Sequence, residues 1–155
     1  MSPDESKDER LDRELIEFLN ELRVVLPGVQ VLFAFMLTVP FTNRFGGITN
    51  QQKQVFFAVF LCTTAATALL IAPSAYHRLR WREFDKEQLL RTSNRLSIAG
   101  MIFLTLALIG VAFLVTDLLF HATAAALVTA AVAGFFAWFW WGLPLMRKLQ
   151  DRQDN

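Results

Sequence analysis

The sequence predicts an all-α polytopic membrane protein, an antiparallel four-helix transmembrane bundle with an amphipathic N-terminal cytoplasmic helix. Hydrophobic residues fill 54% of its 155 positions and charged residues 19%, against about 25% charged in ordinary soluble domains. The charges are also unevenly spread, because 12 of them lie in residues 1–23 and nine in residues 78–95. Long segments with almost no charge remain, which argues against a soluble globular domain and against a disordered chain.

Four segments are long enough to cross a bilayer, whose hydrocarbon core needs about 20 apolar residues in a helix. None has an ionised side chain in its interior, and each is apolar on all faces, as membrane helices are. The expected spans are about residues 24–41, 53–73, 96–117 and 122–145. We therefore divide the chain into an acidic amphipathic cytoplasmic segment (1–23), a transmembrane domain (24–146) and a short cytoplasmic tail (147–155).

Local signals predict where these helices begin and bend. A helix over residues 7–23 places five apolar side chains on one face, namely Leu11, Leu15, Phe18, Leu19 and Leu22. Pro27 and Gly28 are expected to kink or restart the chain as this helix enters the membrane, and Pro73 to end or kink the second span. Thr49 and Gln52 have the spacing of a capping box at the start of the second span.

The distribution of lysine and arginine predicts the orientation in the membrane. Thirteen of these 15 residues lie before the first span, between the second and third spans, or after the fourth span. Four spans place these three regions on the same side of the membrane. The positive-inside rule then predicts a multi-pass protein of the plasma membrane with both termini in the cytoplasm.

The polar residues within the spans have two interpretations each. Gln30, near the middle of the first span, either lines a polar path or ligand site, or forms an interhelical hydrogen bond, which we favour. Thr63, Thr64 and Thr67 form a patch in the second span, in which residues three and four apart share a helix face. They either line a pore or bond back to carbonyls four residues earlier, which we again favour.

Two features of the fourth span predict packing rather than chemistry. Ala126, Ala130 and Gly134 recur every four residues, and such a row of small residues lets another backbone come close, within the bundle or between protomers. Several aromatic residues follow, and an interfacial belt explains them better than a quinone or sterol site does: Phe135, Phe136, Trp138, Phe139, Trp140 and Trp141.

No residue pattern predicts catalysis, a metal site or a cofactor. The chain has one cysteine and two histidines, and no segment has the pattern of a phosphate-binding loop, a nucleophile elbow or a paired-histidine metal motif. Asp117 and His121, four residues apart between the third and fourth spans, are better explained as boundary residues than as a proton sensor. A net charge of +1 gives no case for nucleic-acid binding.

Three stretches of the chain resemble a family of small four-span integral membrane proteins of unknown function, found mainly in actinobacteria. They are residues 20–41 (NELRVVLPGVQVLFAFMLTVPF), 69–82 (LLIAPSAYHRLRWR) and 94–100 (NRLSIAG). The resemblance covers nearly the whole chain and implies the same architecture, a bacterial source and a membrane location, but no activity, cofactor or site residue. Matching residues gather near the cytoplasmic boundary, where we expect Glu21 or Arg23 to contact the segment formed by Tyr76, His77 and Arg78.

We therefore expect an integral membrane protein that is a non-catalytic interaction or accessory module and not an enzyme. Its expected partners are the lipid bilayer and either a second copy of itself or another membrane protein. The alternative is a homo-oligomeric ion channel or small-solute transporter, with Gln30 and the second-span threonines along the path. Four spans in 155 residues leave little interior for a pore in one chain, so this alternative requires oligomers.

Overall fold

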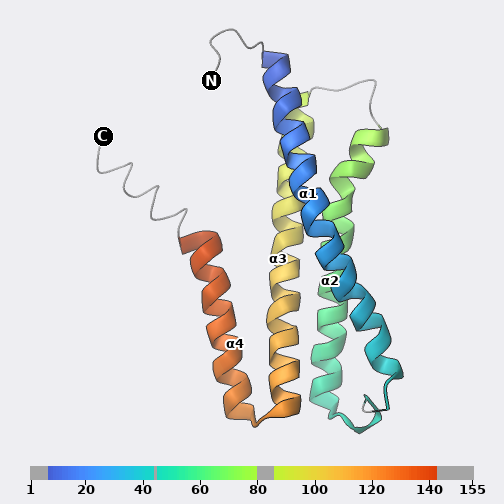
Figure 1. Cartoon of the computed structure of the whole chain (residues 1–155), viewed down its shortest axis with the longest axis vertical. Helices are drawn as coiled ribbons and strands as arrows, with labels where there is room; N and C mark the ends of the chain where they lie inside the picture. The colour runs from blue at the N-terminus through green and yellow to red at the C-terminus, as the bar shows by residue number, and fades with distance from the viewer. Residues whose placement is uncertain (1–6, 44, 80–85, 143–155) are drawn as a thin grey trace, which may run out of the picture. The chain divides into compact units, whose positions relative to one another are not determined.

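The structure, a computed structural model of the chain, describes residues 7–43, 45–79 and 86–142. Every regular element within these residues is helical and none is a strand, which confirms the all-α fold class (Figure 1). In chain order the elements are the helix α1 (Lys7–Thr38), the 3-10 turns η1 (Val39–Phe41) and η2 (Phe45–Gly47), the helices α2 (Asn50–Leu79), α3 (Lys86–Leu119) and α4 (Ala122–Ala137), and the π-helical turn η3 (Trp138–Gly142).

Four helical stretches are long and apolar enough to cross a membrane, as the sequence predicts. They are Glu9–Phe41, Asn50–Ala75, Gln88–Leu119 and Ala122–Trp140. The first three are longer than the expected apolar spans. At 1.5 Å per residue the 34 residues of α3 extend about 51 Å, whereas a bilayer core is about 30 Å thick. These three helices therefore continue into the polar residues that flank their apolar segments, whereas α4 ends at Ala137, before the expected end of the fourth span.

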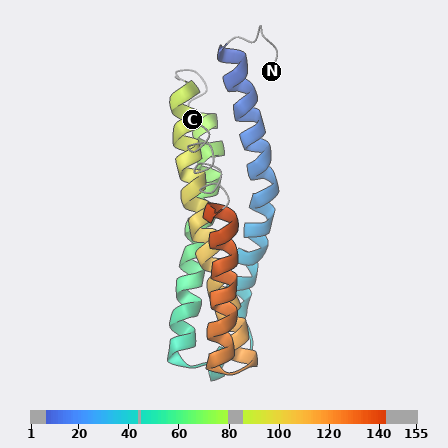
Figure 2. The ribbon, with the colours of Figure 1, turned by 90° about the vertical axis from the view of Figure 1, so that its left-hand side faces the viewer.

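Helix α1 is one unbroken helix of 32 residues that contains Pro27 (Figures 1 and 2). The expected restart at Pro27 and Gly28 does not occur, and the amphipathic N-terminal segment continues directly into the first apolar stretch. A proline in a helix removes one backbone hydrogen bond, here to the carbonyl of Arg23. Pro27 and Arg23 both lie on the exposed side of α1. The buried Pro73 likewise does not end α2, which continues to Leu79.

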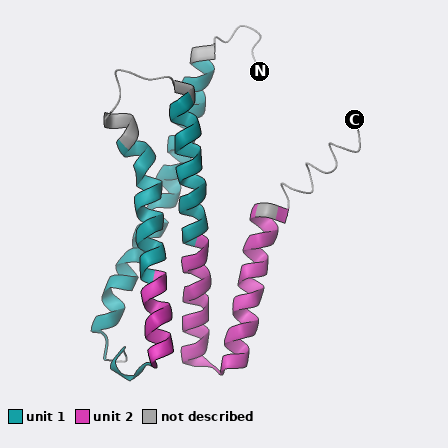
Figure 3. Cartoon of the chain, turned by 180° about the vertical axis from the view of Figure 1, so that it is seen from behind, with its two compact units in different colours: residues 1–48, 60–104 teal, residues 49–59, 105–155 magenta. Residues whose placement is uncertain are grey.

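The chain divides into two compact units (Figure 3). Unit 1 consists of residues 1–48 and 60–104, which include α1, the later part of α2 and the first part of α3. Its core joins two helices through Leu22 and Val29 of α1 and Ala66 and Leu70 of α2, all at most 5% exposed. Leu22 and Val29 are seven residues apart, so both side chains lie on the same face of α1.

Unit 2 consists of residues 49–59 and 105–155, which include the first part of α2, the last part of α3, and α4. The predicted capping box at the start of α2 is confirmed. The backbone N–H of Gln52 donates to Thr49 Oγ1 at 3.2 Å, and the backbone N–H of Thr49 donates to Gln52 Oε1 at 2.9 Å. Helix α4 follows α3 after a short link, and Ala125 is its one buried residue. Most of the α4 surface is therefore not packed against the rest of unit 2.

Candidate functional site

The side chain of Gln30 lies on the exposed side of α1, although the preceding residue, Val29, is 1% exposed. Gln30 stands between two uncharged stretches, residues 24–29 and 31–37. Among the described residues no group forms a hydrogen bond to its amide. An unpaired amide in an apolar medium costs about 2 kcal/mol or more. If α1 crosses a membrane, a polar partner from outside the described residues would therefore stabilise Gln30.

The three second-span threonines do not share one environment. Thr63 is fully buried, Thr67 is half-buried and Thr64 is exposed. The hydroxyl of Thr67 donates to the Thr63 carbonyl, and the hydroxyl of Thr64 donates to the Phe60 carbonyl, each at 2.8 Å. Both bonds are of the back-bonding type that satisfies a threonine hydroxyl within its own helix. The donor capacity of these two hydroxyls is used locally, while their oxygen lone pairs can still accept.

Gln30 and Thr64 lie at the same level of the α1–α2 pair in unit 1. The rings of Phe33 and Phe60 stack there, with centroids 5.7 Å apart and planes 20° apart. Gln30 precedes Phe33 by three residues in α1. Thr64 follows Phe60 by four residues in α2. Since α1 and α2 run in opposite directions (Figure 1), both polar side chains lie about one turn from the stacked rings, toward the same end. Both are exposed, so two polar residues that the sequence identified separately lie at one level of unit 1.

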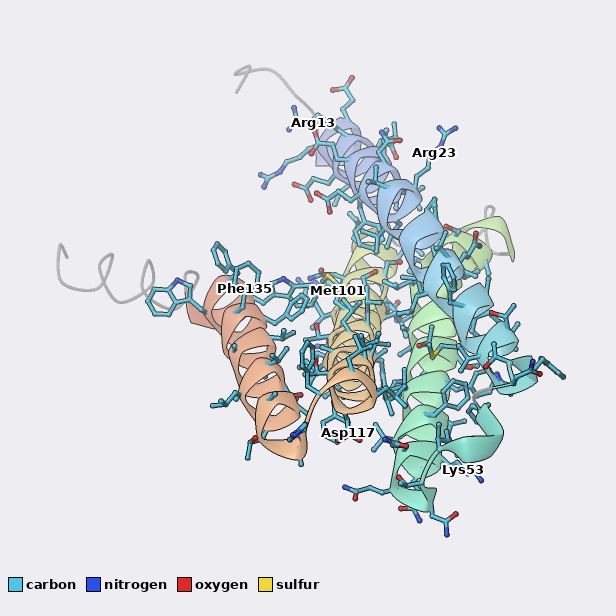
Figure 4. All side chains as sticks on the ribbon, turned by 60° about the horizontal axis from the view of Figure 1, so that its bottom comes forward. Arg13, Arg23, Lys53, Met101, Asp117 and Phe135 are labelled. Atoms are coloured by element: carbon cyan, nitrogen blue, oxygen red, sulfur yellow. The ribbon has the colours of Figure 1, made fainter. Side chains whose placement is uncertain are left out.

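The expected contact at the cytoplasmic boundary lies partly outside the described residues. Glu21 and Arg23 are exposed on α1, and Arg23 extends away from the helix (Figure 4). Tyr76, His77 and Arg78 belong to the last turns of α2, but the positions of their side chains are outside the described part of the structure. A contact between the two groups remains a prediction.

The row of small residues on α4 points away from the rest of unit 2. Ala126, Ala130 and Gly134 are all exposed, and a Cβ atom added to Gly134 would meet nothing within 4 Å. The row therefore does not pack within unit 2, and packing between protomers remains a prediction for it. Aromatic residues follow it, with the Phe135 and Phe139 rings 4.7 Å apart and the Phe136 and Trp140 rings 5.5 Å apart edge to face.

The close helix contacts are instead made by glycines of α3, which the sequence interpretation missed. A Cβ atom at Gly100 would lie 2.8 Å from Leu70 Cγ in unit 1. A Cβ atom at Gly110 would overlap Val59 Cγ2 in unit 2. The available signal was a set of small residues on α3 at helical spacings, all buried or half-buried: Ser93, Ser97, Gly100, Ala107 and Gly110.

Asp117 pairs with Gln52 rather than with His121. Asp117 lies near the end of α3 (Figure 4), and its Oδ2 accepts a hydrogen bond of 2.8 Å from Gln52 Nε2. His121 is exposed and occupies the N-cap position of α4, without a side-chain capping bond. The Gln52 side chain therefore both caps α2 and connects it to α3, which is a structural role at the boundary of the spans.

Comparison with known proteins places the chain in a family. Residues 4–144 match the model of a Family of unknown function (DUF6328). The chain belongs to this family. The DUF6328 match spans every helix from α1 to η3, and it agrees with the resemblance to a family of unknown function seen in the sequence. No curated protein and no solved structure matches the chain.

Membership in DUF6328 assigns no chemistry to any residue of the chain. Within the described residues, no group of three or more His, Cys, Asp or Glu side chains is placed to hold a metal ion. The structural features of this chain that can carry a functional proposal are therefore the exposed polar residues Gln30 and Thr64, the close glycine contacts of α3 and the exposed residues of α4.

Proposed function

We propose that this chain is a multi-pass protein of the bacterial plasma membrane that acts as a non-catalytic interaction module, binding other membrane-embedded helices. The observation that carries the proposal is the Gln30 amide, exposed within the apolar part of α1 and without a partner among the described residues. Acyl chains offer neither donors nor acceptors. A helix from another protein chain can supply both, and such interhelical hydrogen bonds stabilise membrane assemblies.

The close packing between α2 and α3 supports a function at the exposed helix faces rather than between the helices. Gly100 and Gly110 let the backbone of α3 approach Leu70 and Val59 closely, each contact lying within its own unit. Side chains at such contacts fill the space between helices. Little room is left there for a polar path, so the exposed helix faces are the better candidates for function.

The second candidate function is a homo-oligomeric channel or small-solute transporter. It is favoured by the position of Gln30 and Thr64, which are both exposed and lie at one level of unit 1. Several copies arranged around an axis would turn these polar groups toward a shared path. Such a path requires a closed ring, whereas an interaction module requires only one partner helix.

Native mass spectrometry of the complex, extracted gently from its own membrane, tests the proposed function. We expect the 17.6 kDa chain to appear with at least one other protein chain. The Gln30→Leu variant should shift toward the free chain, while the Gln54→Leu variant, which removes an exposed amide near the start of α2, should behave as the wild type. A free monomer at all extraction conditions contradicts the proposal, and a closed ring of four or more copies favours the channel.

Labelling of single cysteines tests the proposed orientation. In a Cys62→Ala background, the exposed positions Asn20 and Gln51 are replaced one at a time by cysteine. The positive-inside rule places Asn20 in the cytoplasm and Gln51 outside. A membrane-impermeant maleimide should label Gln51→Cys in intact cells, and Asn20→Cys only after permeabilisation. Labelling of Asn20→Cys in intact cells would show the opposite orientation.

A further inference from the structure

We infer that the Gln30 face of α1 binds a second copy of this chain, forming a symmetric dimer in which the two Gln30 amides exchange hydrogen bonds. The inference rests on the proposed function as an interaction module and names the partner of that module. The contact surface is a row on α1 that we call the outer row, consisting of Pro27, Gln30, Ala34 and Leu37. All four residues of the outer row are exposed.

The chemistry of the amide favours an identical partner. A glutamine side chain carries both N–H donors and a carbonyl acceptor, so two glutamines related by a two-fold axis can satisfy each other. Copies that insert with the same topology place Gln30 at the same depth, with α1 parallel in both chains. An unrelated partner would need its own polar group at that depth. A second copy of the chain carries such a polar group at that depth, namely its own Gln30.

The geometry of α1 allows the two helices to approach. Residues of the outer row follow one another at intervals of three, four and three positions, which is the alternation that keeps one seam facing a partner along two left-handed, supercoiled helices. The residues one turn on either side of Gln30 are Pro27 and Ala34, and both have short side chains. Short neighbours let the backbones come close enough for the amides to meet.

Thr64, exposed at the same level of unit 1, supplies a further acceptor. Its hydroxyl donates to the Phe60 carbonyl at 2.8 Å, which leaves oxygen lone pairs free to accept. An amide has two N–H donors. In the dimer, one N–H of the partner's Gln30 would bond to Gln30 and the other to Thr64, so that the polar groups at this level are satisfied together.

Disulfide trapping in native membranes tests the dimer. In the Cys62→Ala background, Ala34→Cys lies on the outer row, whereas the matched control Phe35→Cys is also exposed, at 63%, but lies about 100° further around the helix. Mild oxidation should convert Ala34→Cys to a species of twice the 17.6 kDa chain mass and leave Phe35→Cys monomeric. Adding Gln30→Leu should weaken the dimer by roughly tenfold, and Gln30→Asn should retain part of it.

The outcomes separate this inference from the proposed function. Equal trapping at positions 34 and 35, or trapping that Gln30→Leu leaves unchanged, overturns the dimer. Absence of trapping, together with a native mass that shows the chain bound to a different protein, overturns the dimer and leaves the proposed function standing. Absence of trapping with a free monomer in native mass spectrometry overturns both. Because Gln30 is exposed, Gln30→Leu should fold with unchanged helix content, which circular dichroism checks.

Discussion

Replacing Gly110 by alanine should destabilise the protein by about 1–3 kcal/mol. The added Cβ atom would overlap Val59 Cγ2, so α2 and α3 must move apart or Val59 must leave its rotamer. Elsewhere in a helix the same substitution stabilises by about 1 kcal/mol, because alanine has the higher helix propensity. A decrease in the free energy of unfolding on Gly110→Ala, rather than an increase, would therefore indicate the close contact between α3 and Val59. Unfolding in mixed micelles of increasing denaturing-detergent content, followed by helix content, measures it.

Gly134→Ala is the matched control for Gly110→Ala, because a Cβ atom at Gly134 meets nothing within 4 Å. It should leave the free energy of unfolding unchanged or raise it. Val59→Ala removes the atom that the new Cβ overlaps, so Gly110→Ala should lose most of its effect in that background. Equal effects of Gly110→Ala and Gly134→Ala would show that α3 does not approach Val59 as closely as the structure has it.

The second large effect is expected at Leu70, which is fully buried in the core of unit 1. Leu70→Ala should cost about 2 kcal/mol, the lower end of the range for buried leucines, because lipid already provides an apolar environment and the lost packing contacts remain the main term. Leu61→Ala in the same helix is the control, since Leu61 is 50% exposed and should change little. The same unfolding measurement applies.

A substitution at Gly100 provides a second test of the packing around Leu70. A Cβ atom at Gly100 would lie 2.8 Å from Leu70 Cγ, so Gly100→Ala should destabilise the wild type by about 1 kcal/mol or more. In the Leu70→Ala background the overlap with the Leu70 side chain is gone and only the 3.3 Å approach to Leu69 Cβ remains, so the same change should destabilise much less. Additive effects of the two substitutions would contradict the contact between α3 and Leu70.

The helices and their local signals were predictable because they depend on residues close together in the chain. The uncharged runs identify four candidate spans, and the Thr49 and Gln52 spacing identifies the start of α2. The continuity of α1 through Pro27 was not predictable. A proline that breaks a helix and one that a helix tolerates differ in what surrounds the freed carbonyl, and that depends on which side of the helix is exposed.

The sequence also could not predict which side of each helix is exposed, because this depends on the neighbouring helices. The spans are apolar on all sides, so no stripe indicates which side of α1 carries Gln30 outward or which side of α4 leaves Gly134 exposed. Four-residue spacing predicted a packing row on α4, while the small residues of α3, which also recur at helical spacings, were missed. Only the positions of neighbouring helices decide that Gly100 and Gly110 are the residues in close contact. The separate environments of Thr63 and Thr64 have the same origin.

The most direct test of Gln30 as an outward association residue is the monomer–dimer equilibrium of the purified chain in lipid vesicles. Energy transfer between donor- and acceptor-labelled copies is followed as the ratio of protein to lipid is lowered. We expect the energy transfer of the wild type to saturate as the protein-to-lipid ratio rises. The ratio at half-maximal transfer should be roughly tenfold higher for the Gln30→Leu variant. It should be unaltered for Val31→Leu, a change at the neighbouring exposed position. Identical curves for the wild type and Gln30→Leu would contradict the central role of Gln30.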